Sequence, residues 1–371
     1  MRSALSVEEC LPDCPPLMSE TVDSLNEFIA ATVTSRHCRG SPMINIEGSE
    51  PEALQGSGFA TPRGPASWLN DFAWHDGKLI IHKTEIQLRI SRPLINEIAH
   101  WAIYLAILYL VYMCGRLFRR HRPKIWFAPD CPRPWYLVRG AAMWAGIDVA
   151  NSPSSARAAL YFDDSTTGAP PPGRTPLQLN HRCTDITKSH VAKVFADVFG
   201  YPLTVDPRTT IGEVVEKPEK NGVHGGRIVT APLQPRPGWV YQRVVDTRDD
   251  EDCCRDLRTP CAGGAPVVVW IKTKAPEGRF SINNRRAVMA DPAEIYSLDE
   301  LAQIAIFSQR MGLDWGGLDI LRDRNDGRIY IVDVNKTELG PVIALSWRDK
   351  IRSMHRLGRA LNALIGPTPA L

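Results

Sequence analysis

Asp319 and Asp333 lie on two short segments in which polar and apolar residues alternate, and a turn-forming Asn-Asp-Gly sequence separates the segments. Residues 316–335 are therefore expected to form a β-hairpin. Two registers are open. A two-residue turn would pair Asp319 with Val334 and place the two carboxylates on opposite faces. A three-residue loop with Gly327 in the left-handed conformation would pair Asp319 with Asp333 instead.

The second register sorts the side chains better. It gathers apolar residues on one face: Leu318, Ile320, Tyr330, Val332 and Val334. Asp319, Asp333 and Asn335 share the other face, and Gly317 leaves space opposite Asn335. Like charges directly opposed across a sheet destabilise it unless a cation lies between them. Mg²⁺ takes a few carboxylate or amide oxygens together with water and phosphate. The pattern favours a metal site over surface aspartates on an exposed sheet face.

A second group lies about a hundred residues upstream, where residues 214–218 are expected to form a short strand that ends in Lys217 and Pro218. A glycine-rich loop over residues 221–226 follows and leads into another short strand. Glycines let the backbone N–H groups approach one anion, and a lysine at the strand end adds a positive charge. Such loops are common, and this one is not a Walker loop, because no Gly-Lys-Ser/Thr sequence opens a helix.

The chain is expected to have four parts. Residues 1–65 are a poorly ordered leader rich in Gly, Ser and Pro, and residues 66–123 hold a hairpin and an apolar helix. Residues 124–175 form a small α/β domain, which a Pro-rich linker separates from a larger domain over residues 180–366. The hairpin is expected to turn at Asp76-Gly77.

In the small domain, strands are expected at 125–128 and 158–162, with a helix at 134–145 between them. The second strand runs into a polar cluster that includes Asp163, Asp164 and Thr166. Ligands collect at the carboxyl ends of parallel strands, so this cluster is a candidate substrate site, against the alternative of an Asx turn.

Three helices are expected in the larger domain. Thr184 or Asp185 is expected to cap the first, and Ser297 with Glu300 forms a capping box for the second. The third covers roughly residues 347–364.

Residues 98–115 are apolar apart from His100 and run into a cluster of basic residues: Arg116, Arg119, Arg120, Arg122 and Lys124. The segment is near the lower length limit for crossing a bilayer, which takes about 20 residues. Three interpretations stay open: a buried helix, a helix on a membrane surface through residues 98–124, and a true span. In a span, the basic side would keep the following domain in the cytoplasm.

The formal net charge of +3 among 371 residues argues against a nucleic-acid-binding protein, since the basic residues are mixed with acids and form no stripe. Nine cysteines show no paired CxxC spacing, which is typical of reduced thiols in a cytoplasmic protein. No signal peptide is apparent at the N-terminus. We expect a cytoplasmic protein, with membrane association and a homodimer left open.

Together these features resemble the ATP-grasp superfamily over roughly residues 180–345. The resemblance rests on residues 214–218 with their glycine loop, 240–245, 256–258, 316–320 and 330–335. It implies an α/β (α+β) ATP-grasp fold, with residues 124–175 as the smaller preceding domain and a helical, partly disordered N-terminal region.

The resemblance also implies roles for single residues. Asp319, Asp333 and Asn335 would be ligands of Mg²⁺, or of Mn²⁺ in its place. A further set would bind ATP, at the phosphates or in the adenine slot: Lys188, Lys217, Gly225, Gly226, Gln242, Arg243, Val244 and Asn283. Lys217 and Arg279, the latter with Asn283 or Asn284, would act near the transferred phosphoryl group.

The sequence departs from the family pattern at three places. Asp333 stands where the family usually has glutamate, and Lys336 begins a segment that replaces the usual Pro-Gly turn. Gly317 occupies a position where some family ligases have arginine. These differences concern the acceptor substrate more than ATP.

The expected activity is a Mg-ATP-dependent ligase that joins a small-molecule carboxylate to an amine or related nucleophile through an acyl phosphate, releasing ADP and phosphate. An ATP-dependent phosphotransferase on the same fold and a non-catalytic nucleotide-binding protein are the alternatives.

Overall fold

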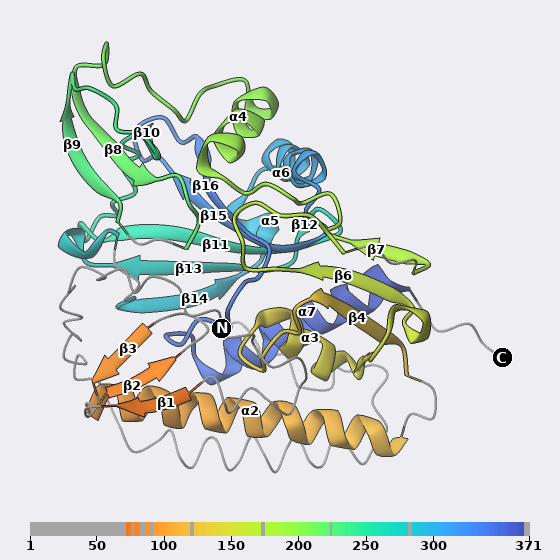
Figure 1. Ribbon diagram of the computed structural model, residues 1–371. Helices are drawn as coiled ribbons and strands as arrows, with labels where there is room; N and C mark the ends of the chain where they lie inside the picture. The colour runs from red at the N-terminus through yellow and green to blue at the C-terminus, as the bar shows by residue number, and fades with distance from the viewer. Residues whose placement is uncertain are drawn as a thin grey trace, which may run out of the picture. The chain divides into compact units, whose positions relative to one another are not determined.

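The computed structural model describes residues 72–75, 78–81, 86–89, 92–118, 122–171, 175–222, 225–280 and 284–366, all within one compact unit, Glu52–Leu371. The expected leader, residues 1–65, lies outside the described residues. The fold is mixed α/β, with parallel and antiparallel sheets, as expected from the sequence (Figure 1).

The small domain is built on a parallel sheet in the order β5-β4-β6-β7. Its elements are β4 (Lys124–Pro129), α3 (Leu137–Ala145), β5 (Asp148–Val149), β6 (Ala158–Phe162) and β7 (Leu177–Leu179). Short β-branched and aromatic runs form the strands, and all five residues of β6 are buried. The polar cluster after Phe162 therefore stands at the carboxyl end of a central parallel strand.

Two antiparallel sheets make up most of the larger domain (Figure 1). The small sheet has the order β10-β8-β9, with β8 (Gly212–Pro218), β9 (Arg227–Ala231) and β10 (Trp239–Arg243). The large sheet has the order β14-β13-β11-β15-β16, with β12 paired to β11. Its strands are β11 (Cys254–Ala262), β12 (Ala265–Pro266), β13 (Val269–Lys274), β14 (Arg286–Ala290), β15 (Trp315–Arg322) and β16 (Ile329–Asn335).

Helices α4 (Lys188–Phe199) and α6 (Leu298–Met311) cover one face of the large sheet, where Phe195 and Phe307 pack with Leu318 and Val334. The capping box at Ser297 is present as expected. The cap of α4 is Thr187, whose side chain accepts a hydrogen bond from the backbone N–H of His190, and not Thr184 or Asp185. Asp185 instead accepts a hydrogen bond from the N–H of Thr187.

Helix α7 (Trp347–Ile365) packs against α3 and, through Trp270 and Ser353, against the large sheet. The short helix α5 (Pro292–Ile295) precedes α6. These contacts join the small domain and part of the large sheet in one apolar core.

The N-terminal hairpin forms as expected. Strands β1 (Phe72–His75) and β2 (Lys78–Ile81) pair from His75 to Lys78, and β3 (Ile86–Arg89) adds a third strand. The two expected turn residues, 76 and 77, lie outside the described residues. Helix α2 (Arg92–Phe118) follows, and only one of its sides is buried.

Candidate functional site

The hairpin of β15 and β16 has the register that sets its acidic side chains together. Asp319 lies directly opposite Asp333, and Gly317 lies opposite Asn335. Gly327 is left-handed with φ +72, as expected. A bulge next to Asp319 shifts the strand pairing, so the last backbone hydrogen bond before the loop joins Asp323 to Arg328. The connecting loop is therefore longer than the expected three residues.

A row of charged residues crosses the large sheet at this point. Arg258 on β11 lies opposite Asp319, and its Nη1 donates to Asp319 Oδ2 at 2.6 Å. Lys272 on β13 reaches the other oxygen of Asp319 at 3.3 Å. We call Asp256, Arg258, Lys272, Lys274, Asp319 and Asp333 the charged face. Opposite charges on neighbouring strands stabilise this arrangement, except at the Asp319–Asp333 pair.

Glu338 lies just beyond β16, and its carboxylate reaches the charged face next to Gly317. Its Oε1 accepts a hydrogen bond from Arg258 Nε at 2.6 Å, and its side chain is fully buried. A Cβ atom at residue 317 would collide with the Glu338 carboxylate. The missing side chain of Gly317 thus makes room for the partner of Arg258, a reason for glycine that the sequence did not reveal.

Two lysines approach the aspartates from other elements. Lys188, the first residue of α4, has its ammonium 3.9 Å from Asp333 Oδ1, and its side chain is buried. Lys217 stands near the end of β8. Burial, with a smaller contribution from Lys188, lowers the pKa of Lys217 to about 8, and the negative charges of Asp333 and Asp319 oppose this shift. The two lysines and the two aspartates therefore form one electrostatic group.

The two aspartates of the pair differ in how their charges are balanced. Burial raises the pKa of Asp319, but Arg258 and Lys272 outweigh it and hold this pKa well below its usual range. Asp333 is the reverse case: burial and the neighbouring Asp319 charge raise its pKa, and Lys188 compensates only in part. Nearby cations therefore balance the negative charge of Asp319 but only part of the negative charge of Asp333.

This unbalanced charge fits a divalent cation. Among the described residues no group of three His, Cys, Asp or Glu side chains could hold a metal ion. Mg²⁺ does not require one, since one or two carboxylates with substrate phosphates commonly suffice. Asp333 and Asn335 would hold it together with Asp319; the Asn335 Oδ1 already accepts a hydrogen bond from the N–H of Thr337. Asp319 would have to share its oxygens with Arg258 and Lys272.

The last two residues of the glycine loop, Gly225 and Gly226, lie beside the end of β8 at Lys217 and Pro218. Gly226 lies against the stem of Lys217 and the ring of Phe280, and a Cβ atom at Gly226 would be 3.1 Å from that ring. Gly225 lies against Pro218. Gly226 is therefore next to the lysine, and two other residues of the loop, 223 and 224, lie outside the described residues.

Arg279 does not point at the aspartates. Its guanidinium donates to the carbonyl of Val245, and Lys274 bonds to the Arg279 carbonyl at 3.4 Å. This places the guanidinium beside the segment expected to line the adenine slot. Asn283 lies outside the described residues. Its neighbour Asn284 is half-buried before β14.

The expected adenine segment lies at the end of β10, where Gln242 and Arg243 are the last two residues of the strand and Val244 follows it. Gln242 is 1% exposed, and its amide nitrogen has no hydrogen-bond partner. A buried donor without a partner is uncommon in a folded protein and suits a ligand acceptor. Arg243 donates to the hydroxyl of Tyr330 at 2.6 Å, so it is tied to the large sheet, and the next residue, Val244, is half-buried.

The polar cluster of the small domain reaches the same region. Asn221, at the start of the glycine loop, donates its backbone N–H to Thr166 Oγ1 at 2.9 Å and its amide to the carbonyl of Val334 at 3.3 Å. Asp163 and Asp164 each accept a hydrogen bond from a tyrosine hydroxyl at 2.8 Å. The three candidate residues, Asp163, Asp164 and Thr166, lie close together in the sequence, and both carboxylates already accept hydrogen bonds from side chains of the protein.

Sequence reasoning missed several members of the site: Asp256, Arg258, Lys272, Lys274 and Glu338. A signal was present, because Asp256 and Arg258 alternate, as do Lys272 and Lys274, so each pair lies on one face of its strand. Asp256 also pairs directly with Lys272. What the sequence lacked was the pairing of β11 with β13 and β15, which brings these faces together.

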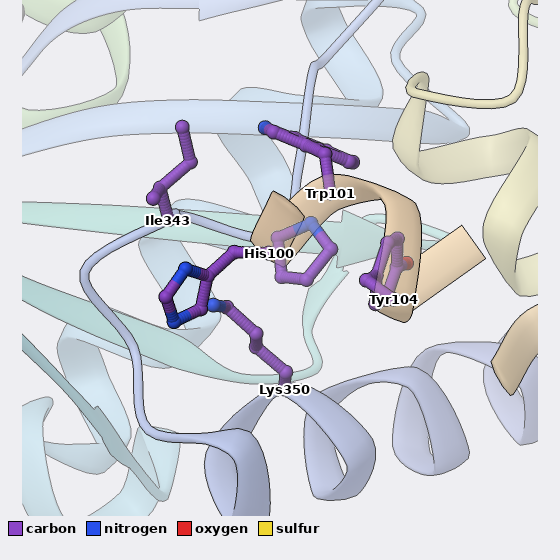
Figure 2. Close-up of a pocket in the computed structure, with 6 residues that line it drawn as sticks. His100, Trp101, Tyr104, Ile343 and Lys350 are labelled. Carbon is purple, nitrogen blue, oxygen red and sulfur yellow. The ribbon is translucent and has the colours of Figure 1, made fainter. Parts of the chain in front are cut away.

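A small pocket lies elsewhere, between α2, α7 and the segment after β16 (Figure 2). It is lined by His100, Trp101, Tyr104, Pro341, Ile343 and Lys350. Figure 2 shows the Lys350 side chain reaching towards the His100 ring. Burial lowers the pKa of Lys350 to about 8. None of the carboxylates of the charged face lines this pocket, so it is separate from the site above.

No family model and no curated protein matches the sequence. Solved structures do match. One is the ATP-grasp ligase PsnB with a minimal precursor, Mg and ADP, at 13% identity and TM-score 0.41, covering 66% of this chain and 97% of that one.

Two further ATP-grasp structures match at a TM-score of 0.39. The RimK domain protein from Sphaerobacter thermophilus is 14% identical, with 66% of this chain and 100% of that one covered. D-alanine–D-alanine ligase from Bacillus anthracis with ATP is 12% identical, with 66% and 97% covered. Two other PsnB structures are spanned only over 65% and 62% of their length.

Proposed function

We propose that this protein is a Mg-ATP-dependent ligase that joins a carboxylate to an amine or related nucleophile and releases ADP and phosphate. The observation that carries the proposal is the directly opposed pair Asp319–Asp333, with Lys217 and Lys188 facing it from two other elements. Such a pair destabilises a sheet by itself, and a phosphate-bound cation would relieve it.

Each group of side chains would have a separate role in binding Mg-ATP. Lys217 and Lys188 would bind phosphate oxygens and balance the charge that develops on transfer. Asp319, Asp333 and Asn335 would hold Mg²⁺, which supplies charge neutralisation at the phosphates when bound. Arg258 keeps Asp319 ionised and oriented. The free amide nitrogen of Gln242 would donate to the base in the slot after β10.

In the proposed reaction a substrate carboxylate oxygen forms a bond to the γ-phosphorus of ATP, and the bond from that phosphorus to ADP breaks. The resulting acyl phosphate is attacked at its acyl carbon by the amine nitrogen. The carbon–oxygen bond to phosphate then breaks, phosphate leaves, and the amine gives up a proton to solvent. The polar cluster around Thr166, tied to the glycine loop through Asn221, is the nearest candidate for binding the acceptor.

The first assay is ADP and phosphate release with pools of carboxylic acids and amines, with hydroxylamine added to trap an acyl phosphate as a hydroxamate. We expect equal ADP and phosphate release that needs a carboxylate, and hydroxamate formation without an amine. A stable phosphorylated product with no free phosphate would replace the ligase with a phosphotransferase. No turnover with any pool would leave nucleotide binding only.

A further inference from the structure

Helix α2 carries an apolar surface that the other described parts of the chain leave uncovered. Its segment Ile95–Phe118 is long and apolar enough to cross a membrane by length and composition. Between residues 98 and 115 it contains no Asp, Glu, Lys or Arg. A helix that is apolar on all sides is either buried or in contact with lipid.

One side of α2 belongs to the protein core. Tyr104 and Leu108 are buried beside α3, and the His100 ring stacks on Trp347 of α7 at 5.5 Å. Spanning a bilayer would pull these side chains out of the core. The helix therefore lies along the protein surface and does not cross a membrane in this fold.

The other side of α2 is exposed. Large apolar side chains there are between 40% and 78% exposed: Ile95, Ile98, Ile103, Tyr109, Leu110, Met113, Leu117 and Phe118. At about 100° per residue, Ile95, Leu110, Met113 and Leu117 fall on one stripe opposite Tyr104. We call Ile95, Leu110, Met113 and Leu117 the apolar stripe, and the other four exposed side chains lie beside it or near its ends; exposed apolar side chains gathered on one side of a helix mark an interaction site.

The charges around the apolar stripe favour one kind of partner. Exposed Arg92 and Arg116 stand at its two ends, and Arg119 and Arg120 follow in the sequence. The helix has one acidic residue, Glu97, which is half-buried on the opposite side. A second copy of the stripe would bring arginines against arginines in either orientation, with no acid to pair them. An anionic surface complements them.

We propose that α2 docks this protein in the plane of an anionic lipid bilayer, with the apolar stripe inserted at the boundary of headgroups and acyl chains and the arginines on the lipid phosphates. The stripe faces away from α3 and the core, so docking needs no rearrangement of the fold. The proposal stands apart from the ATP chemistry.

The test is co-sedimentation of the full chain with phosphatidylcholine vesicles, with and without phosphatidylserine. We expect binding to the phosphatidylserine vesicles that weakens with salt. The variant Leu110→Glu with Met113→Glu is expected to reduce it by on the order of tenfold or more, through loss of apolar burial. Ile211→Glu, at a residue 90% exposed in the larger domain, is the matched control and is expected to bind as the wild type.

Arg92→Gln with Arg116→Gln is expected to reduce the preference for phosphatidylserine while leaving the fold intact, since both side chains are exposed. Wild type that stays in solution with both vesicles would overturn the proposal. The proposal would also be overturned if the wild type formed dimers and the Leu110→Glu, Met113→Glu variant were monomeric, because the stripe would then be the contact with a second copy. Hydrogen-exchange protection of residues 1–71 that the same variant removes would assign it to the leader.

Discussion

Replacing Arg258 with methionine is expected to lower the free energy of unfolding by about 3–5 kcal/mol, the usual cost of removing one partner from a buried ion pair. The Arg258 side chain is 13% exposed and donates to Asp319 and Glu338, so its loss leaves two carboxylates without their main partner. The burial that raises the pKa of Glu338 would then act unopposed by Arg258.

Chemical denaturation at neutral pH measures this effect. Arg248→Met is the matched control, because Arg248 also pairs with two aspartates but its side chain is 49% exposed. An exposed pair of this kind is screened by solvent and contributes little to stability. Equal losses in the two variants would contradict a buried, structural role for Arg258.

Nucleotide affinity is expected to fall as pH rises from 7 to 9, because Lys217 loses its proton near its lowered pKa of about 8. Below that pKa the ammonium is charged and attracts phosphate; above it the neutral amine does not. Lys217→Met is expected to weaken binding at pH 7 by about tenfold to a hundredfold, as for a lost charged hydrogen bond, and to flatten the pH profile.

Calorimetric titrations with a non-hydrolysable ATP analogue and Mg²⁺ across this pH range give the measurement. Lys193→Met, on the exposed side of α4, is the control and is expected to keep the wild-type profile. A profile that is the same in the Lys217 variant as in the wild type would show that another group titrates.

The sequence predicted the β15–β16 hairpin well because the information is local. Only one register gathers the apolar residues on one face, and Gly327 marks the turn. The bulge beside Asp319 was not predictable, since an extra residue in a loop and an extra residue in a strand give the same sequence spacing.

The partners of Asp319 could not be predicted for a different reason. Arg258 lies 61 positions away in the sequence, and its contact depends on β11 pairing with β15. Alternation shows that Asp256 and Arg258 share a face, but it does not show which strand lies alongside. The role of Gly317 depends on the same long-range packing, because only Glu338 explains it.

The exposed side of α2 was also hidden from sequence patterns. A helix with one buried side normally shows charged residues on the other, and α2 has no Asp, Glu, Lys or Arg between residues 98 and 115. The sequence of α2 therefore shows no periodic alternation of polar and apolar residues. Only the structure shows which of its side chains are buried.

The central claim is that Asp319, Asp333 and the facing lysines bind Mg-ATP. Calorimetry with a non-hydrolysable ATP analogue, with and without Mg²⁺, tests it on wild type and Asp333→Asn. Asp326→Asn, on the exposed turn of the same hairpin, is the control. We predict Mg-dependent binding in the wild type and the control, and a loss of at least about tenfold in Asp333→Asn. Wild type without Mg-dependent binding, or Asp333→Asn with wild-type affinity, would contradict the account.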